Sequence, residues 1–213
     1  MYFIGLTFHQ NFVQFKKIDS FRRQFDPHYN HCKMLQMTIL PPFELPFQGQ
    51  KQAKKGISEL AQILSEDLDS IFFGQENLMR LDFKKLEFSY NKKPMIYLSA
   101  KVPEELKYAQ ESLANSLEEW EVKFKRKGIK FYDSVLPIGK PSREFIFRQA
   151  VSTARSDFDF PISLYVSGIV LFEKLPGHWP VVKRLYHNDL DVDEMRSNEF
   201  GFRQENNQWR EFI

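Results

Sequence analysis

Hydrophobic residues along this chain predict the same order of secondary structure twice. After an apolar strand at 2–8, the first half predicts a helix, a strand, a helix and two strands: 11–25, 33–40, a segment after Gly49 that includes 57–71, 81–90 and 95–99. The second half predicts the same order: a helix opened by Pro103 and running to Phe124, a strand at 131–139, a helix at 142–155, and a hairpin joining 158–172 to 179–186. Two local signals set boundaries: Pro41-Pro42 should end the strand at 33–40, and Ser142 should cap the helix that follows it.

Two such units facing each other predict a duplicated, pseudo-two-fold α+β fold. We expect two antiparallel sheets that form a central cleft, with the helices outside, and such a cleft is a usual place for a ligand. Residues 1–186 should form one bilobal domain whose lobes, about 1–100 and 101–186, can exchange elements. Residues 187–213 form a C-terminal extension that carries aromatic residues, which favours docking of the extension over disorder.

Composition and motifs exclude several classes of protein. A formal charge of +2 is too small to indicate a general polyanion binder. Cys32 is the only cysteine, so an intrachain disulfide and thiolate-rich zinc sites are excluded, and a reducing, cytoplasmic location is expected. The sequence has no glycine-rich phosphate loop, and no apolar run approaches the roughly 20 residues that span a bilayer, so no membrane partner is expected.

The segment FRRQFDPHYNHCKMLQMTILPPF, at 21–43, resembles the N-terminal signature of the 2H phosphoesterase superfamily, which includes 2'-5' RNA ligases and cyclic phosphodiesterases. In that family an arginine-bearing helix ends at Asp-Pro, and a loop leads to a strand with a His-x-Thr motif. Arg22 or Arg23 matches the arginine of this helix, and Asp26-Pro27 matches its end. FYDSVLPIGKP, at 131–141, is similar to the family's second motif strand, and 166–185 is similar to its closing hairpin. The resemblance spans about residues 1–186 and implies the duplicated fold.

The resemblance also implies a metal-independent reaction in which two histidines act as general base and general acid while two hydroxyls hold the phosphate. In this chain Gln36 stands at the first histidine and Thr38 at the first hydroxyl, whereas Val135 and Pro137 replace the second pair. Glutamine cannot transfer a proton at neutral pH, and valine and proline offer no side-chain donor or acceptor. Each lost acid–base group is typically worth about 10²–10⁴ in rate, so the chain is interpreted as a degenerate member.

The first hypothesis is therefore that the protein lacks the catalytic pair and binds a phosphate-bearing ligand, such as RNA or a nucleotide, in the central cleft. Gln36, Thr38, Tyr132 and Lys140 are the candidate ligand-binding residues, and neither a cofactor nor a metal is expected. A second hypothesis is an active phosphodiesterase or ligase with relocated groups, for which the candidates are His31, Tyr132 and Tyr165. A third is a protein-interaction module whose cleft is filled by side chains.

Other polar clusters have ordinary interpretations that compete with a site. The segment DPHYNHC, at 26–32, has ligand-like His-x-x-His spacing, but a polar loop is the favoured interpretation, as is an inert thiol for Cys32. His9, His178 and His187 are expected at the surface or in turns. The basic and aromatic residues of 123–132 favour a solvated helix end over a single-strand binding patch. The lysines at 51–55 lie at a helix N-terminus, where cations gain nothing from the dipole, which is slightly more indicative of an anion partner.

Overall fold

Four helices and eight strands follow one another in the part of the chain that the computed structural model describes. It describes residues 1–46, 50–72, 79–90, 94–124 and 135–187, without the side chains of His31, 50–54 and Lys123. The elements are β1 Tyr2–Phe8, α1 Val13–Phe25, β2 Gln36–Glu44, α2 Gln50–Phe72, β3 Arg80–Ser89, β4 Met95–Ala100, α3 Glu104–Glu119, β5 Lys123–Phe124, β6 Val135–Gly139, α4 Glu144–Asp157, β7 Ile162–Glu173 and β8 Val181–His187. A short 3-10 turn, Tyr29–His31, precedes β2. The predicted element order is confirmed, with β5 added between α3 and β6.

All the strand pairs are antiparallel, and one long strand connects them into a continuous path. The order is β5-β2-β1-β7-β3-β4-β6, with β8 also paired to β7. Residues 162–165 of β7 pair with β3, whereas residues 166–173 pair with β1. The α+β class with antiparallel strands is thus confirmed, but the two groups of strands expected as separate sheets are joined through β7. The duplication remains a prediction.

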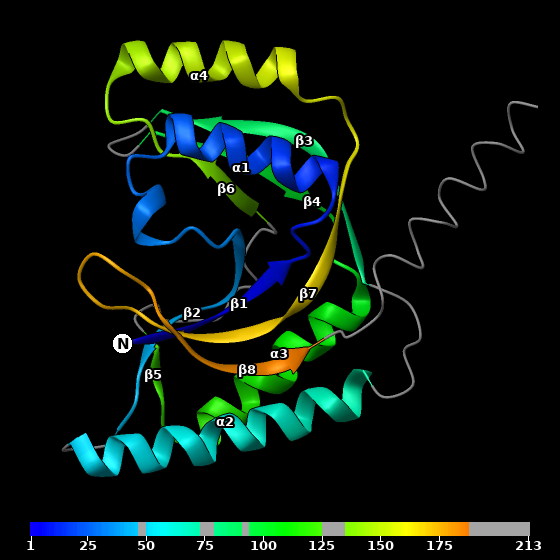
Figure 1. The fold of residues 1–213 in the computed structure, drawn as a ribbon. Coiled ribbons are helices and arrows are strands. Elements are labelled where there is room, and N and C mark those ends of the chain that lie inside the picture. The colour runs from blue at the N-terminus through cyan, green and yellow to red at the C-terminus, as the bar shows by residue number, and fades with distance from the viewer. Residues whose placement is uncertain (47–49, 73–78, 91–93, 125–134, 188–213) are drawn as a thin grey trace, which may run out of the picture.

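The helices cover the strands from two opposite sides (Figure 1). In Figure 1, α4 is uppermost and α1 lies below it, beside β3 and β6, while α2 is lowest and α3 lies between α2 and β7. Each group combines the two halves of the chain: β6 of the second half pairs with β4 of the first, and β7 of the second pairs with β1. This arrangement brings β2 and β6, the two strands predicted to carry the motifs, into contact with each other.

The buried residues of α2 and α3 recur at helical spacing. On α3, the residues spaced by three or four positions are buried: Leu106, Ala109, Leu113 and Leu117. On α2, the same holds for Leu60, Ala61, Leu64 and Leu68. These faces pack on the strands because their burial removes apolar surface from water, at about 25 cal/mol per Å². The main core therefore runs through both groups of strands.

Three predicted boundaries are wrong, each for a local reason. β2 continues through Pro41-Pro42 to Glu44, because the register with β1 shifts between Ile4 and Tyr2 and this bulge tolerates residues without N–H groups. α3 ends at Glu119, because Glu121 has a φ of 53°, and Phe124 lies in β5 instead. Arg143, not Ser142, occupies the N-cap of α4, and its side chain makes no capping hydrogen bond.

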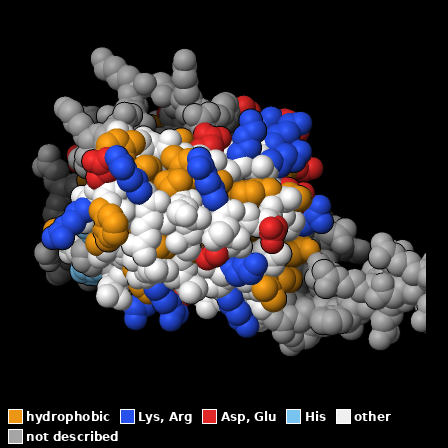
Figure 2. All heavy atoms as spheres, turned by 90° about the horizontal axis from the view of Figure 1, so that it is seen from above, with side chains coloured by type: hydrophobic (Ala, Val, Ile, Leu, Met, Phe, Trp, Pro, Cys, Tyr) orange, Lys and Arg blue, Asp and Glu red, His pale blue; other side chains and the backbone are white. Residues whose placement is uncertain are grey.

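The outer face over α4 and α1 carries no single type of side chain. Figure 2 shows basic, acidic and hydrophobic side chains interspersed on the face seen from above. Such a mixture is typical of an ordinary solvated surface. Within the described residues, no helix has the length and apolar character needed to cross a bilayer.

Candidate functional site

A cavity of about 290 Å³ lies where β2, β6 and the end of α1 meet. Its size is at the lower end of the range for small-molecule sites. Its wall combines two cations, one carboxylate, an imidazole, a thiol, a hydroxyl, an amide and an indole, and the residues that line it are Arg22, Asp26, His28, Cys32, Met34, Gln36, Thr38, Pro137, Lys140, Gly177 and Trp179. The cavity thus contains Gln36, Thr38, Pro137 and Lys140 from the predicted site.

Strand β2 places Gln36 and Thr38 on the cavity side. The burial pattern alternates, with Met37 and Ile39 buried on the opposite face, as a period of two requires. Thr38 pairs with Gly5 of β1, and a Cβ at Gly5 would lie only 3.2 Å from the Met37 carbonyl oxygen. The missing side chain at Gly5 therefore lets β1 and β2 lie close together beside the two polar groups.

The amide oxygen of Gln36 is buried and has no hydrogen-bond partner among the described residues. Buried polar atoms are almost always bonded in folded proteins, and an unbonded one costs about 1–3 kcal/mol. An atom in this state is available to a ligand that brings a hydrogen-bond donor. This feature distinguishes Gln36 from a residue that only fills space.

Strand β6 forms the opposite wall with groups that cannot transfer protons. Pro137 lines the cavity and pairs with Tyr97 of β4. Val135, two residues earlier, is half-buried and pairs with Ser99. Val135 is not among the described residues that line the cavity, whereas Pro137 is. The wall facing Gln36 therefore carries no imidazole or hydroxyl at either motif position.

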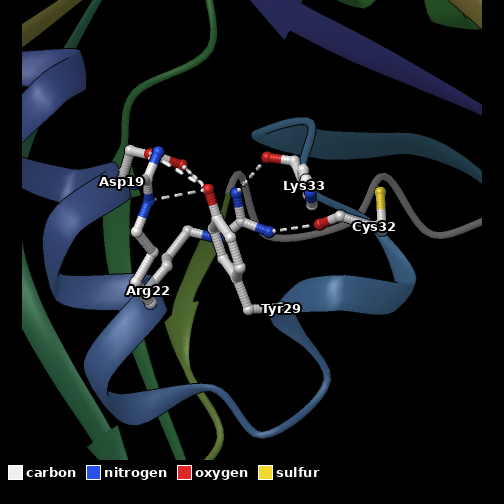
Figure 3. Close-up of polar contacts among 6 residues, drawn as sticks. Asp19, Arg22, Tyr29, Cys32 and Lys33 are labelled. Carbon is white, nitrogen blue, oxygen red and sulfur yellow. Dashed lines mark hydrogen bonds and ion pairs between the residues drawn. The ribbon is translucent and has the colours of Figure 1, made fainter.

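Arg22 is a buried cation at the edge of the cavity, held by backbone carbonyl groups. Its side chain donates hydrogen bonds to the oxygens of Lys33, at 3.1 Å, and of Cys32, at 2.8 Å (Figure 3). The residue is only 6% exposed. Because carbonyls do not neutralise its charge, Arg22 keeps a positive charge beside the cavity as well as fixing the loop before β2.

The neighbouring Arg23 has a different role. It forms an ion pair of 2.9 Å with Asp19 and donates to the Tyr29 hydroxyl, which itself donates to Asp19. Both guanidinium groups lie over the Tyr29 ring, at 5.3 and 5.5 Å from its centre. Of the two arginines that matched the signature, Arg22 thus lines the cavity, whereas Arg23 binds Tyr29 of the loop on the exposed side.

The loop at 26–35 is part of the cavity wall, which the sequence alone did not predict. Asp26 accepts a hydrogen bond from the His28 N–H at 3.0 Å, and Asp26, His28 and Cys32 line the cavity. Burial raises the pKa of the Cys32 thiol, although Arg22 beside it acts in the opposite direction, so the thiol is poorly reactive at neutral pH. The side chain of His31 lies outside the described residues. No group of three or more metal-ligating side chains was found in the described part of the chain.

Lys140 follows β6 and reaches the cavity from the second half of the chain. Its backbone N–H donates to the Phe25 carbonyl at 3.2 Å, which joins β6 to the end of α1. Its ammonium group lies 5.8 Å from the centre of the Trp179 ring. Tyr132, the remaining predicted ligand-binding residue, lies outside the described residues, as does the basic segment from 125 to 132. Lys51 and Lys54 lie in α2, but their side chains are not described. Lys55 is exposed, and its Nζ atom lies 3.7 Å from Oε1 of Glu59.

His9, expected at the surface or in a turn, follows β1 and is half-buried. Its N–H donates to the Tyr165 carbonyl at 3.0 Å, which extends the β1–β7 ladder, and its Nε2 atom is buried without a partner among the described residues. Burial, with a further effect of His187, lowers the pKa of His9. Tyr165, a candidate relocated group, stacks on Phe12 with ring centres 4.5 Å apart. Extending the alternation of strand 2–8 by one residue could have suggested that His9 lies on the same face as Thr7.

Comparison with solved structures shows similarity over nearly the whole chain. The TT0787 protein of Thermus thermophilus is 14% identical, covers 89% of this chain and 99% of its own, and has a TM-score of 0.52. A protein described as a phosphoesterase is 13% identical, with 88% and 98% covered and a TM-score of 0.48. Escherichia coli LigT, solved in complex with 3'-AMP, is 13% identical, with 88% and 98% covered and a TM-score of 0.45. No family model and no curated protein matches the sequence. The similarity to TT0787 shows a shared fold.

Proposed function

From the premise that this chain has the fold of the 2H phosphoesterase superfamily, we propose that it binds a phosphate-bearing ligand, such as a nucleotide or an RNA end, in the cavity between β2 and β6, without hydrolysing it. The observation that carries the proposal is the convergence of two cations, Arg22 and Lys140, on a cavity that also holds Thr38 and Gln36. Charged donors, a hydroxyl and an amide are the groups that bind phosphate oxygens.

The same cavity lacks the means for acid–base catalysis at the family's motif positions. Gln36 forms one wall, and Pro137 forms the other. Asp26 and His28 also line the cavity, but neither stands at a motif position, so the pair that activates the nucleophile and protonates the leaving oxygen in the family is missing from β2 and β6. A cavity of about 290 Å³ also favours ligand binding over an interaction module whose cleft is filled by side chains.

Isothermal titration calorimetry with adenosine 3'-monophosphate, 2',3'-cyclic AMP and inorganic phosphate tests the proposal. We expect binding by the wild-type protein, at least tenfold weaker binding by Lys140→Met and Thr38→Val, and no product in the cyclic nucleotide samples. Lys107→Met is the matched control, because Lys107 lies on the outer helix α3 and pairs with Glu104. Absence of binding by the wild type, or equal loss in the control, would refute the proposal.

A further inference from the structure

Trp179 lines the cavity beside the two cations. It follows the β7–β8 turn, in which Leu175 and His178 form an isolated bridge and Gly177 has a φ of 78°. This left-handed backbone favours glycine and directs the chain back toward the strands. The indole is therefore positioned by an ordered hairpin.

The indole rests on a small apolar cluster that is separate from the main core. The cluster contains Phe3, Val170 and Phe172, with Met34 and Trp179 packed against it. The Phe3 and Phe172 rings stack with centres 5.0 Å apart, and Phe3 meets Trp179 nearly at right angles, with centres 5.6 Å apart. Trp179 is thus supported on one side by aromatic rings from β1 and β7.

The cluster lies on the face of the strands that carries the polar groups of the cavity. Gly5 of β1 pairs with Thr38 on one side and with Val170 on the other, so both side chains share the face of Gly5. Phe3 lies two residues from Gly5 and therefore shares this face as well. An apolar aromatic surface consequently adjoins the hydroxyl and the cations that would hold a phosphate.

Two lysines lie near the indole without holding it tightly. The ammonium groups of Lys140 and Lys174 lie 5.8 and 6.0 Å from the ring centre, at the outer limit of a cation–π contact. At this distance the attraction is weak, so either lysine can turn toward a phosphate while the ring receives a planar group. A ligand with both an anionic group and an aromatic ring would satisfy this arrangement more fully than phosphate alone.

We propose that Trp179 is a stacking surface for the base of a nucleotide whose phosphate lies at Arg22 and Lys140. This inference rests on the proposed function and narrows the ligand to a nucleoside phosphate or the terminal nucleotide of an RNA chain. Stacking of a base on an aromatic side chain is typically worth a factor of about 5 to 150 in affinity. The phosphate contacts are made by other residues and should not depend on the indole.

Calorimetric titrations with adenosine 3'-monophosphate, ribose 5-phosphate and inorganic phosphate test the inference. Trp179→Leu should weaken binding of the adenosine nucleotide about 5- to 150-fold and change the affinity for the two compounds without a base less than twofold. Trp179→Phe should retain most of the nucleotide affinity. The inference is overturned if Trp179→Leu weakens all three ligands equally or none of them.

A fluorescence measurement avoids any folding defect of Trp179→Leu. The chain has three tryptophans, and the double variant Trp120→Phe/Trp209→Phe leaves Trp179 as the only one. We expect adenosine 3'-monophosphate to quench its emission and ribose 5-phosphate to leave it unchanged. If both compounds bind and change the emission equally, the stacking inference alone is overturned. If adenosine 3'-monophosphate, ribose 5-phosphate and inorganic phosphate all fail to bind, the proposed function is overturned as well.

Discussion

Replacement of Arg22 by methionine should destabilise the protein much more than the same replacement of its neighbour Arg23. Arg22, which is buried, donates two hydrogen bonds to the carbonyl oxygens of Cys32 and Lys33. Hydrogen bonds to charged groups contribute about 1.5–3 kcal/mol each, and we take the lower value because both acceptors are neutral carbonyl groups. Two such bonds and the contact with the Tyr29 ring give an expected loss of about 3–4 kcal/mol.

Methionine is suitable because it fills the volume of the arginine stem without its donors. Urea unfolding at pH 7, followed by circular dichroism, should show this loss as a lower midpoint with an unchanged slope. For a chain of this size, the melting temperature should fall by about 6–16 °C. Because methionine keeps the apolar volume of the arginine stem, the lost free energy of unfolding reports the hydrogen bonds to the loop and not the loss of apolar packing.

Arg23→Met is the matched control on the same helix. The Arg23 side chain is 67% exposed, and its ion pair with Asp19 is screened by water, so the replacement should shift the midpoint only slightly. If both variants shifted the midpoint equally, the two carbonyl contacts of Arg22 would contribute nothing measurable. The account of how α1 holds the loop at 26–35 would then be wrong.

Three further perturbations have expected outcomes. Between about pH 6.5 and the lowered pKa of His9, the unfolded chain binds a proton at His9 that the folded chain excludes, so the wild type should lose up to about 1.4 kcal/mol of stability per pH unit as the pH falls. His9→Phe should remove this loss, and an unchanged pH profile in urea titrations would contradict the expectation. Gly168→Ala should lower stability by about 1–3 kcal/mol in thermal melts, because its Cβ would lie 2.5 Å from a carbonyl oxygen of β8; an unshifted melt would contradict the close approach. The triple variant Gln36→His/Val135→His/Pro137→Thr should gain at least about 10²-fold in hydrolysis of 2',3'-cyclic AMP over the wild-type background, and a folded variant without any gain would contradict the proposed equivalence of β2 and β6.

Local patterns predicted the elements and the two motif strands. Alternation along β2 placed Gln36 and Thr38 on one face, and the structure confirms this because a strand with a buried opposite face has only one register. The boundaries failed where backbone effects dominate, as at Pro41-Pro42, which a bulge accommodates. Helical spacing alone could not show that the chain leaves α3 before Phe124.

The composition of the cavity could be predicted only in part, because most of its wall depends on long-range packing. The signature limited the cavity arginine to Arg22 or Arg23, but only the fold shows that Arg22 donates to the loop carbonyl groups. Trp179 comes from a hairpin in the second half of the chain, far from β2 in sequence, and it packs against Phe3 beside the cavity. His9 looked like a surface residue because its burial depends on β7, which pairs with β1 from the far end of the chain.

We propose that the cavity binds a nucleotide phosphate without acid–base catalysis. One sample tests both parts: 2',3'-cyclic AMP incubated with stoichiometric pure protein without added metal, with bound ligand measured by equilibrium dialysis and products by chromatography. The account predicts bound cyclic nucleotide that remains intact over hours and is released in Lys140→Met. Conversion to a 2'- or 3'-monophosphate, or no bound nucleotide at all, would contradict it.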